Sequence, residues 1–199
     1  EFNILNVQLM QMDILDISQY NKQFDIIECC GVLHHMQNPM QGLEALLSVL
    51  NVRGYLKIAL YSEAARQFVV KAREYIRVHN ISSNEASIRS FRRDILNGNL
   101  PELSQFLEAL DFFSLSMCRD LCFHTNEYRY SISQLKDMFT LYNLNFLGFS
   151  YLKDRSELYK KNYPDDVHQL DLNNWEKLER QNPHIFYGMY QFWVSNKEN

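Results

Sequence analysis

Glycine is scarce in this chain, and its scarcity excludes one class of ligand-binding loop. The sequence has 199 residues, of which only 6 are glycine and 4 are proline. No two glycines lie close enough to form the G-x-G turn with which many nucleotide-binding domains approach their ligand. Apolar runs are also short, and none approaches the roughly 18 residues that span a bilayer. We therefore expect no membrane-spanning segment.

Cysteine is sparse too, and its placement suits neither a disulfide framework nor a zinc knuckle. The four cysteines are Cys29, Cys30, Cys118 and Cys122, and Cys29 and Cys30 are adjacent on an expected strand and point to opposite faces. Reduced, mostly buried thiols in a cytoplasmic protein are the expectation. With a net charge of -4 and a pI near 5.9, the chain has no broad basic field, so nucleic acid is an unlikely partner.

The content of apolar residues, 46%, is sufficient for one large domain with a substantial core. Residues 4–12 alternate and predict a strand with Asp13 at its carboxyl end. Residues 24–30, FDIIECC, show no alternation, which is typical of a strand buried on both faces of a parallel sheet. A helix is expected from Pro39, and a further strand over 55–62. This order indicates an α/β fold.

The remainder of the chain interrupts that alternation with helices. The patterns predict helices over 63–79, 84–97, 101–110, 131–143 and 171–181, and strands over 144–152 and 184–195. Ser131 is available as a helix cap. The polar stretch 153–166, KDRSELYKKNYPDD, is expected to be a mobile loop.

The amino-acid sequences of several motifs resemble those of a known family. Four stretches are similar to class I S-adenosylmethionine-dependent methyltransferases, in particular bacterial ones found in chains with tetratricopeptide repeats. These stretches are QMDILDI, FDIIECCGVLHHMQNPMQGLEALLSVLNVRGYLKIALYSEAAR, DFFSLSMCRDLCFHTNEYRYSI and NPHIFYGMYQFWVSNK. The resemblance covers essentially the whole chain. It implies a Rossmann-like sheet, N-terminally truncated, that forms a single partial methyltransferase domain over 1–199, with a helical insertion or lid over 63–126 and a second insertion over 153–183.

The same resemblance implies a cofactor site for S-adenosylmethionine at the carboxyl ends of the strands. Asp13 matches the family's acidic residue that accepts a hydrogen bond from the adenine amino group, and Ile14 would lie against the ring. Gly31 and Val32 would flank the methionine part, and His34 would line the pocket. Glycine after a strand lets the backbone approach a ligand closely.

The chain departs from the family at its N-terminal end. Its glycine-rich loop and the acidic residue that holds the ribose hydroxyls have no counterpart here. Without the strands that precede them, strand 24–30 would be an apolar parallel edge. We therefore expect the chain to be a fragment, inactive alone, of a longer protein, with an upstream tetratricopeptide-repeat or methyltransferase segment, or a second chain, supplying the missing strands.

Two polar constellations are candidates for chemistry. A metal site on His34 and His35 is disfavoured, because adjacent rings rarely aim at one ion, so one of them lining the pocket without metal is the interpretation. His124 and Glu127 would face the same side if their stretch were helical, as a base with an acidic orienter or as a polar network that pins the insertion. Tyr61 either reaches the pocket or belongs to the core.

The expected function is methyl transfer from S-adenosylmethionine to an oxygen, nitrogen or carbon acceptor, on a small molecule or a protein. Alternatives are a non-catalytic methyltransferase-fold interaction module and, more remotely, a metal-dependent hydrolase built on His34, His35 and His124.

Overall fold

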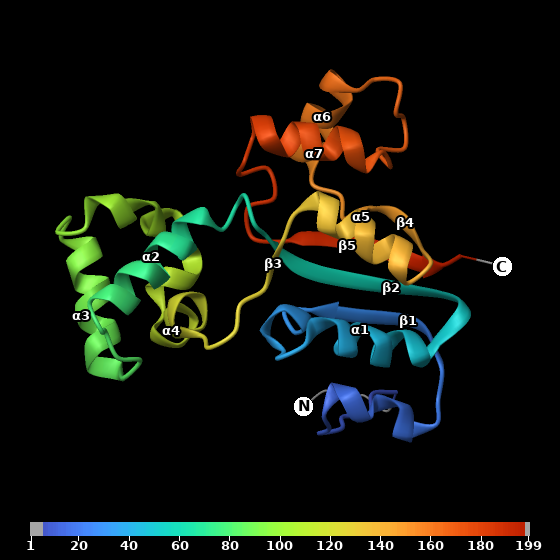
Figure 1. Cartoon of the computed structure of the whole chain (residues 1–199), viewed down its shortest axis with the longest axis horizontal. Helices are drawn as coiled ribbons and strands as arrows, with labels where there is room; N and C mark the ends of the chain where they lie inside the picture. The colour runs from blue at the N-terminus through green and yellow to red at the C-terminus, as the bar shows by residue number, and fades with distance from the viewer. Residues whose placement is uncertain (1–5, 198–199) are drawn as a thin grey trace.

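The computed structural model describes residues 6–197 and shows a five-stranded mixed sheet flanked by helices (Figure 1). The strands follow the order β1, β2, β5, β4, and β3 pairs with the end of β2. β1 and β2 are parallel, whereas β5 runs antiparallel to both β2 and β4. The strands are β1 (Phe24–Cys30), β2 (Leu50–Ser62), β3 (Arg129–Tyr130), β4 (Leu144–Phe149) and β5 (Tyr190–Asn196).

The first unit, β1-α1-β2, forms in the predicted order, but β1 is not buried on both faces as its sequence predicted. Of its seven residues only Cys29 is buried, because the described helices cover the face that carries Ile27 and Cys29 and leave Ile26 and Cys30 exposed on the other. α1 (Pro39–Ser48) begins after Asn38, whose side chain accepts a hydrogen bond from the backbone N–H of Met40 at 3.1 Å. Parallel strands need such a crossover, and α1 supplies it. As expected from strand geometry, Cys29 is buried and Cys30 is exposed, and the described cysteines are all free thiols.

β1 is the edge of the sheet in the part of the chain that the structure describes. It pairs with β2 alone, and the apolar side chain of Ile26 is 62% exposed. The expectation of a strand with an uncovered apolar edge is therefore confirmed.

The helices between β2 and β3 have a core of their own and form a separate lobe, at the left in Figure 1. Ile88 and Phe91 of α3 and Phe106 and Phe112 of the following turns are almost completely buried there. The lobe comprises α2 (Gln67–Val78), α3 (Glu85–Leu96), the 3-10 helices η3 (Pro101–Glu108) and η4 (Leu110–Phe113), and α4 (Leu115–Phe123).

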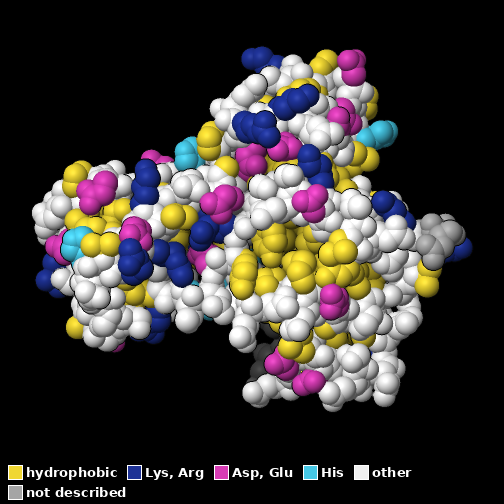
Figure 2. Space-filling model, viewed as in Figure 1, with side chains coloured by type: hydrophobic (Ala, Val, Ile, Leu, Met, Phe, Trp, Pro, Cys, Tyr) yellow, Lys and Arg dark blue, Asp and Glu magenta, His cyan; other side chains and the backbone are white. Residues whose placement is uncertain are grey.

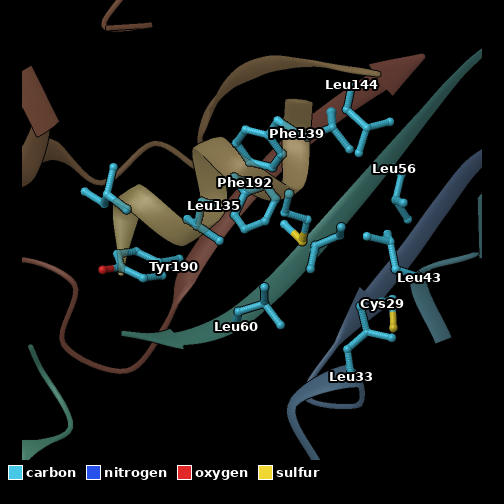
Figure 3. Close-up of a cluster of buried hydrophobic side chains, with 14 of the residues drawn as sticks. Cys29, Leu33, Leu43, Leu56, Leu60, Leu135, Phe139, Leu144, Tyr190 and Phe192 are labelled. Atoms are coloured by element: carbon cyan, nitrogen blue, oxygen red, sulfur yellow. The ribbon is translucent and has the colours of Figure 1, made fainter. Parts of the chain in front are cut away.

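The second half of the chain completes the main core (Figure 3). Leu135 and Phe139 of α5 (Ile132–Leu141) pack on Phe192 and Tyr190 of β5, so the aromatic final strand is core, as expected. Ser131 caps α5 in a reciprocal capping box with Gln134, which confirms the predicted cap. The hairpin from β4 to β5 carries α6 (Lys153–Asn162) and α7 (Leu172–Gln181).

Two predicted elements are wrong. Residues 6–12 form no strand and are largely exposed, and the chain enters the 3-10 helix η1 (Ile14–Tyr20) instead; residues 4–5 of the predicted strand lie outside the described residues. Alternation alone does not make a strand, because a strand needs a neighbour to take its backbone hydrogen bonds. The stretch 153–166, predicted as a mobile loop, mostly forms α6, which is anchored by the fully buried ring of Tyr159.

Other boundaries shift. The helix expected over 101–110 is a pair of short 3-10 helices, and the strand expected from 184 begins at Tyr190. The helix expected from 63 begins at Gln67. Between residues 6 and 197, no helix combines the length and the apolar character that a membrane span requires.

Candidate functional site

The carboxyl ends of β1 and β2 lie side by side, because the strands are parallel and paired, and the loops beyond them form the candidate site. The short 3-10 helix η2 (Leu33–His35) follows β1. The segment 124–130 crosses over it: the backbone N–H of Tyr128 donates to the carbonyl of His34 at 2.9 Å, and β3 pairs with Tyr61 and Ser62. The helical lobe is thus tied to the end of β1.

Gly31 opens this loop in a conformation that other residues avoid. Its φ is +79°, in the left-handed region, and a Cβ placed on it would have no heavy atom within 4 Å. Glycine is therefore required by the backbone conformation and not by crowding, and the space above its backbone is open. Val32, next in the chain, is 42% exposed. An approaching ligand would meet bare backbone and one apolar side chain.

Asp13 and Ile14 lie at the start of η1, which packs against α1. Asp13 caps η1: its Oδ1 accepts from the backbone N–H of Leu15 at 2.9 Å, and the residue is otherwise exposed. Ile14 is half-buried against the main core. Asp13 therefore keeps acceptor capacity for a ligand amino group, beside an apolar surface.

Four aromatic rings stack at the centre of the site. The ring centroid of His34 lies 3.9 Å from that of Tyr61 and 4.4 Å from that of His35. His35 in turn lies 4.0 Å from His124. These contacts link the end of β1, the end of β2 and the lobe into one continuous row of rings.

His34 is completely buried and is neutral at physiological pH. Neither ring nitrogen has a hydrogen bond of good geometry within the described chain, and burial lowers the pKa of His34 to about 4, with the neighbouring His35 acting in the same direction. The backbone of Ala59 favours the charged form only slightly. His34 thus lies beneath the surface of the site, behind His35 and Tyr61.

His35 is the better-placed proton acceptor. Its Nδ1 lies 3.0 Å from the carbonyl oxygen of Asn126, which can only accept, so Nδ1 carries the proton and Nε2 carries the lone pair. Burial lowers the pKa of His35, an effect that the bond to Asn126 opposes only in part. His35 is therefore neutral near pH 7. Its side chain is only half-buried. Nδ1 of His124 shares the same carbonyl, at 2.7 Å.

The predicted pairing of His124 with Glu127 needs correction. α4 ends at Phe123, so the two residues are on extended chain and not on one helix face, and no hydrogen bond joins them among the described residues. Glu127, whose side chain is 0% exposed, instead binds Nη2 of Arg66 at 2.6 Å and approaches Nη1 of Arg129 at 3.4 Å. The Glu127 carboxylate, held between two guanidinium groups, therefore acts as a structural counter-ion and not as an orienter of His124.

Arg66 also explains the position of Tyr61. Its guanidinium lies 3.8 Å from the centroid of the Tyr61 ring, on which His34 also packs. Burial raises the pKa of Tyr61, so the phenol is protonated and serves as a wall of the site. Sequence reasoning missed Arg66, Arg129 and Asn126. The sequence feature that could have indicated these three residues is their position after the end of β2 and after the lobe, where the ligand-contacting loops of α/β sheets lie.

The described residues contain no group of three histidine, cysteine, aspartate or glutamate side chains that could hold a metal ion. The proximity of His34, His35 and His124 is one of stacked rings, with faces and edges in contact. Nitrogen lone pairs, which lie in the ring plane, do not converge in such a stack.

Comparisons with known proteins relate the chain to methyltransferases. Residues 1–58 match the family model described as a methyltransferase domain. An uncharacterised protein of Synechococcus is 31% identical over 153 residues, which are 72% of this chain and 36% of that protein. A tRNA U34 carboxymethyltransferase of Campylobacter fetus is 32% identical over 78 residues, 38% of this chain and 28% of the relative. The chain thus spans little more than a third of these relatives at most.

Solved structures share the fold. PKMT2 from Rickettsia typhi superimposes with a TM-score of 0.68 at 16% identity, over 98% of this chain and 39% of that one. The complex of the same protein with AdoHcy gives a TM-score of 0.70 at 14% identity, over 98% and 40%. The chain therefore has the Rossmann-like α/β fold of these structures, which confirms the fold class expected from the sequence.

Proposed function

We propose that this chain is the part of a class I methyltransferase domain that holds one side of S-adenosylmethionine and the methyl acceptor. The observation that carries the proposal is the loop after β1, where Gly31 exposes bare backbone at a left-handed turn inside the segment that matches the methyltransferase model. The shared fold with an AdoHcy-bound protein supports it, because AdoHcy is what remains of the cofactor after methyl transfer.

The residues present fit the cofactor. Asp13 offers a free acceptor for the adenine amino group and Ile14 an apolar surface for the ring. Gly31 and Val32 are open beside the place proposed for the methionine part. His34 is fully buried, so its proposed part is to support His35 and Tyr61 from below and not to touch the cofactor.

The bound cofactor supplies an activated methyl group on a sulfonium, and the chain's part is to hold the acceptor in line with it. Where the acceptor must lose a proton, His35 is the proposed base through Nε2. His124 and Glu127, the pair first considered for this role, position it: His124 packs on His35, and Glu127 neutralises Arg66 below the rings. The helical lobe over 63–126 is the proposed lid.

The test is calorimetry with AdoHcy on the protein at its natural length. The proposal predicts saturable binding, weakened at least tenfold by Asp13→Ala and unchanged by Asp16→Ala, a change of the same kind further along η1. Absence of binding in the unaltered protein would favour a non-catalytic module instead. A cytoplasmic location, the tetratricopeptide-repeat segment and a small-molecule or protein acceptor remain proposals that rest on the resemblance.

A further inference from the structure

A cavity opens beside the row of rings, within the helical lobe. It has a volume of about 540 Å³, in the range of small-molecule sites, and lies between α2 and the end of α4. One part of its wall is apolar, and the other is charged, with three arginines and the carboxylate of Glu74. The apolar part includes Val70, Ile76 and Phe123, and the arginines of the charged part are Arg73, Arg77 and Arg129.

Among the described residues, Arg73 is the arginine of this wall for which no carboxylate partner is found. Its Nη2 donates to the backbone carbonyl of His124 at 2.7 Å, while its Nη1 is covered and has no hydrogen-bond partner in the described chain. A buried N–H without a partner is costly, and a guanidinium prefers a planar anion that accepts two parallel hydrogen bonds. Arg73 therefore has a donor without a partner, and because that donor is covered, its guanidinium must turn toward the cavity to anchor an anionic group.

The neighbouring arginines differ in how firmly they are held. Arg77 pairs with Glu74 at 2.6 Å on the surface, with side chains 72% and 57% exposed, and such pairs exchange partners readily. Arg129 is held by Glu63 and by the buried Glu127. Figure 2 shows Lys and Arg side chains gathered on the lobe where Figure 1 places α2 and α4. Arg77 can thus swing to a ligand, whereas Arg129 stays in place.

His124 connects the cavity with the site described above. It is part of the cavity wall, and its ring stacks on that of His35 at 4.0 Å. A molecule that fills the cavity would therefore contact the ring of His124, which is one ring removed from His35 at the end of β1. The apolar wall would take the uncharged part of such a molecule.

We infer that this cavity binds the anionic group of the methyl acceptor, which is a small acidic molecule bearing a carboxylate or a phosphate next to an apolar portion. Arg73 anchors the anion and Arg77 adds to it after releasing Glu74. That the bound molecule is the methyl acceptor rests on the proposed function, whereas the anion site itself does not.

The experiment is calorimetric titration of the natural-length protein with inorganic phosphate and, separately, with benzoate, which carries a carboxylate on an apolar ring. Arg73→Gln is expected to weaken binding of the preferred anion at least tenfold. Lys71→Gln, the same charge change on an exposed residue of α2 outside the cavity, is expected to change it less than twofold. Tighter binding of benzoate identifies a carboxylate acceptor, and tighter binding of phosphate a phosphorylated one.

Glu74→Gln keeps the test decisive should Arg73→Gln disturb folding. It frees Arg77 and is expected to tighten anion binding about threefold, a gain that misfolding cannot mimic. Binding of neither anion, or equal losses in Arg73→Gln and Lys71→Gln, would overturn the anion site. Anion binding in a protein that fails to bind AdoHcy would leave the site standing and overturn its link to methyl transfer.

Discussion

The buried ion pair between Arg66 and Glu127 gives the sharpest prediction for stability. Their side chains are 6% and 0% exposed and approach to 2.6 Å. Glu127→Gln keeps the shape of the side chain and removes its charge, so Arg66 remains buried without its counter-ion. Breaking a buried pair in this way typically costs about 3–5 kcal/mol.

The surroundings refine that magnitude. With charge centres about 4 Å apart and an effective dielectric constant of about 20, the lost attraction is about 4 kcal/mol. The Tyr61 ring, 3.8 Å from the guanidinium, remains and offsets part of the loss, as does the amide of the new glutamine. We therefore expect Glu127→Gln to lower the free energy of unfolding by about 3 kcal/mol.

The assay is equilibrium urea unfolding, with Glu85→Gln as the matched control. Glu85 pairs with Arg89 across one helical turn, with side chains 60% and 57% exposed, and its loss is expected to cost under about 1 kcal/mol. If the two variants were destabilised equally, the buried pair would not hold the lobe to the end of β2, and the account of Glu127 as a structural counter-ion would fail.

Two further predictions concern the loop after β1. Gly31→Ala places a side chain at a φ of +79° in open space, and the control Gly98→Ala does the same at +75°, so each should lower the free energy of unfolding by about 1 kcal/mol. Only Gly31→Ala should weaken AdoHcy binding, and equal binding by the two variants would refute the role of Gly31. Burial lowers the pKa of His34 to about 4, so only the unfolded chain takes up its proton between about pH 6.5 and 4, and stability should fall by up to about 3 kcal/mol as the pH drops through that window. His34→Phe should flatten this slope in urea unfolding at several pH values, whereas His168→Gln, on an exposed residue, should not; an unchanged slope in His34→Phe would refute it.

The first α/β unit was predictable because its signals are local. The β-branched and aromatic residues of β1 and the proline at the start of α1 each reflect the preference of a few consecutive residues, although the burial of β1 on both faces did not follow from them. The cap of α5 by Ser131 was equally visible. The loop position of Gly31 followed from the end of β1, and its left-handed conformation is consistent with the choice of glycine.

The failures come from long-range contacts. α6 looks too polar for a packed helix, yet its buried residues Arg155 and Tyr159 anchor it. The ring centroid of Tyr159 lies 4.2 Å from that of Trp175, a contact that periodicity does not reveal. The predicted pairing of His124 with Glu127 does not form, because Glu127 instead accepts a hydrogen bond from Arg66, which lies 61 residues away in the sequence. Such a pairing becomes visible only once the topology brings β3 beside β2.

The measurement that tests the central claim most directly is photo-crosslinking of radiolabelled S-adenosylmethionine to the natural-length protein, followed by mapping of the labelled peptide. The account predicts label on the segments around Asp13 and Ile14 or Gly31 to His35, with the label suppressed by excess AdoHcy. Label confined to other segments, or label that excess AdoHcy does not suppress, would contradict a cofactor site at the end of β1.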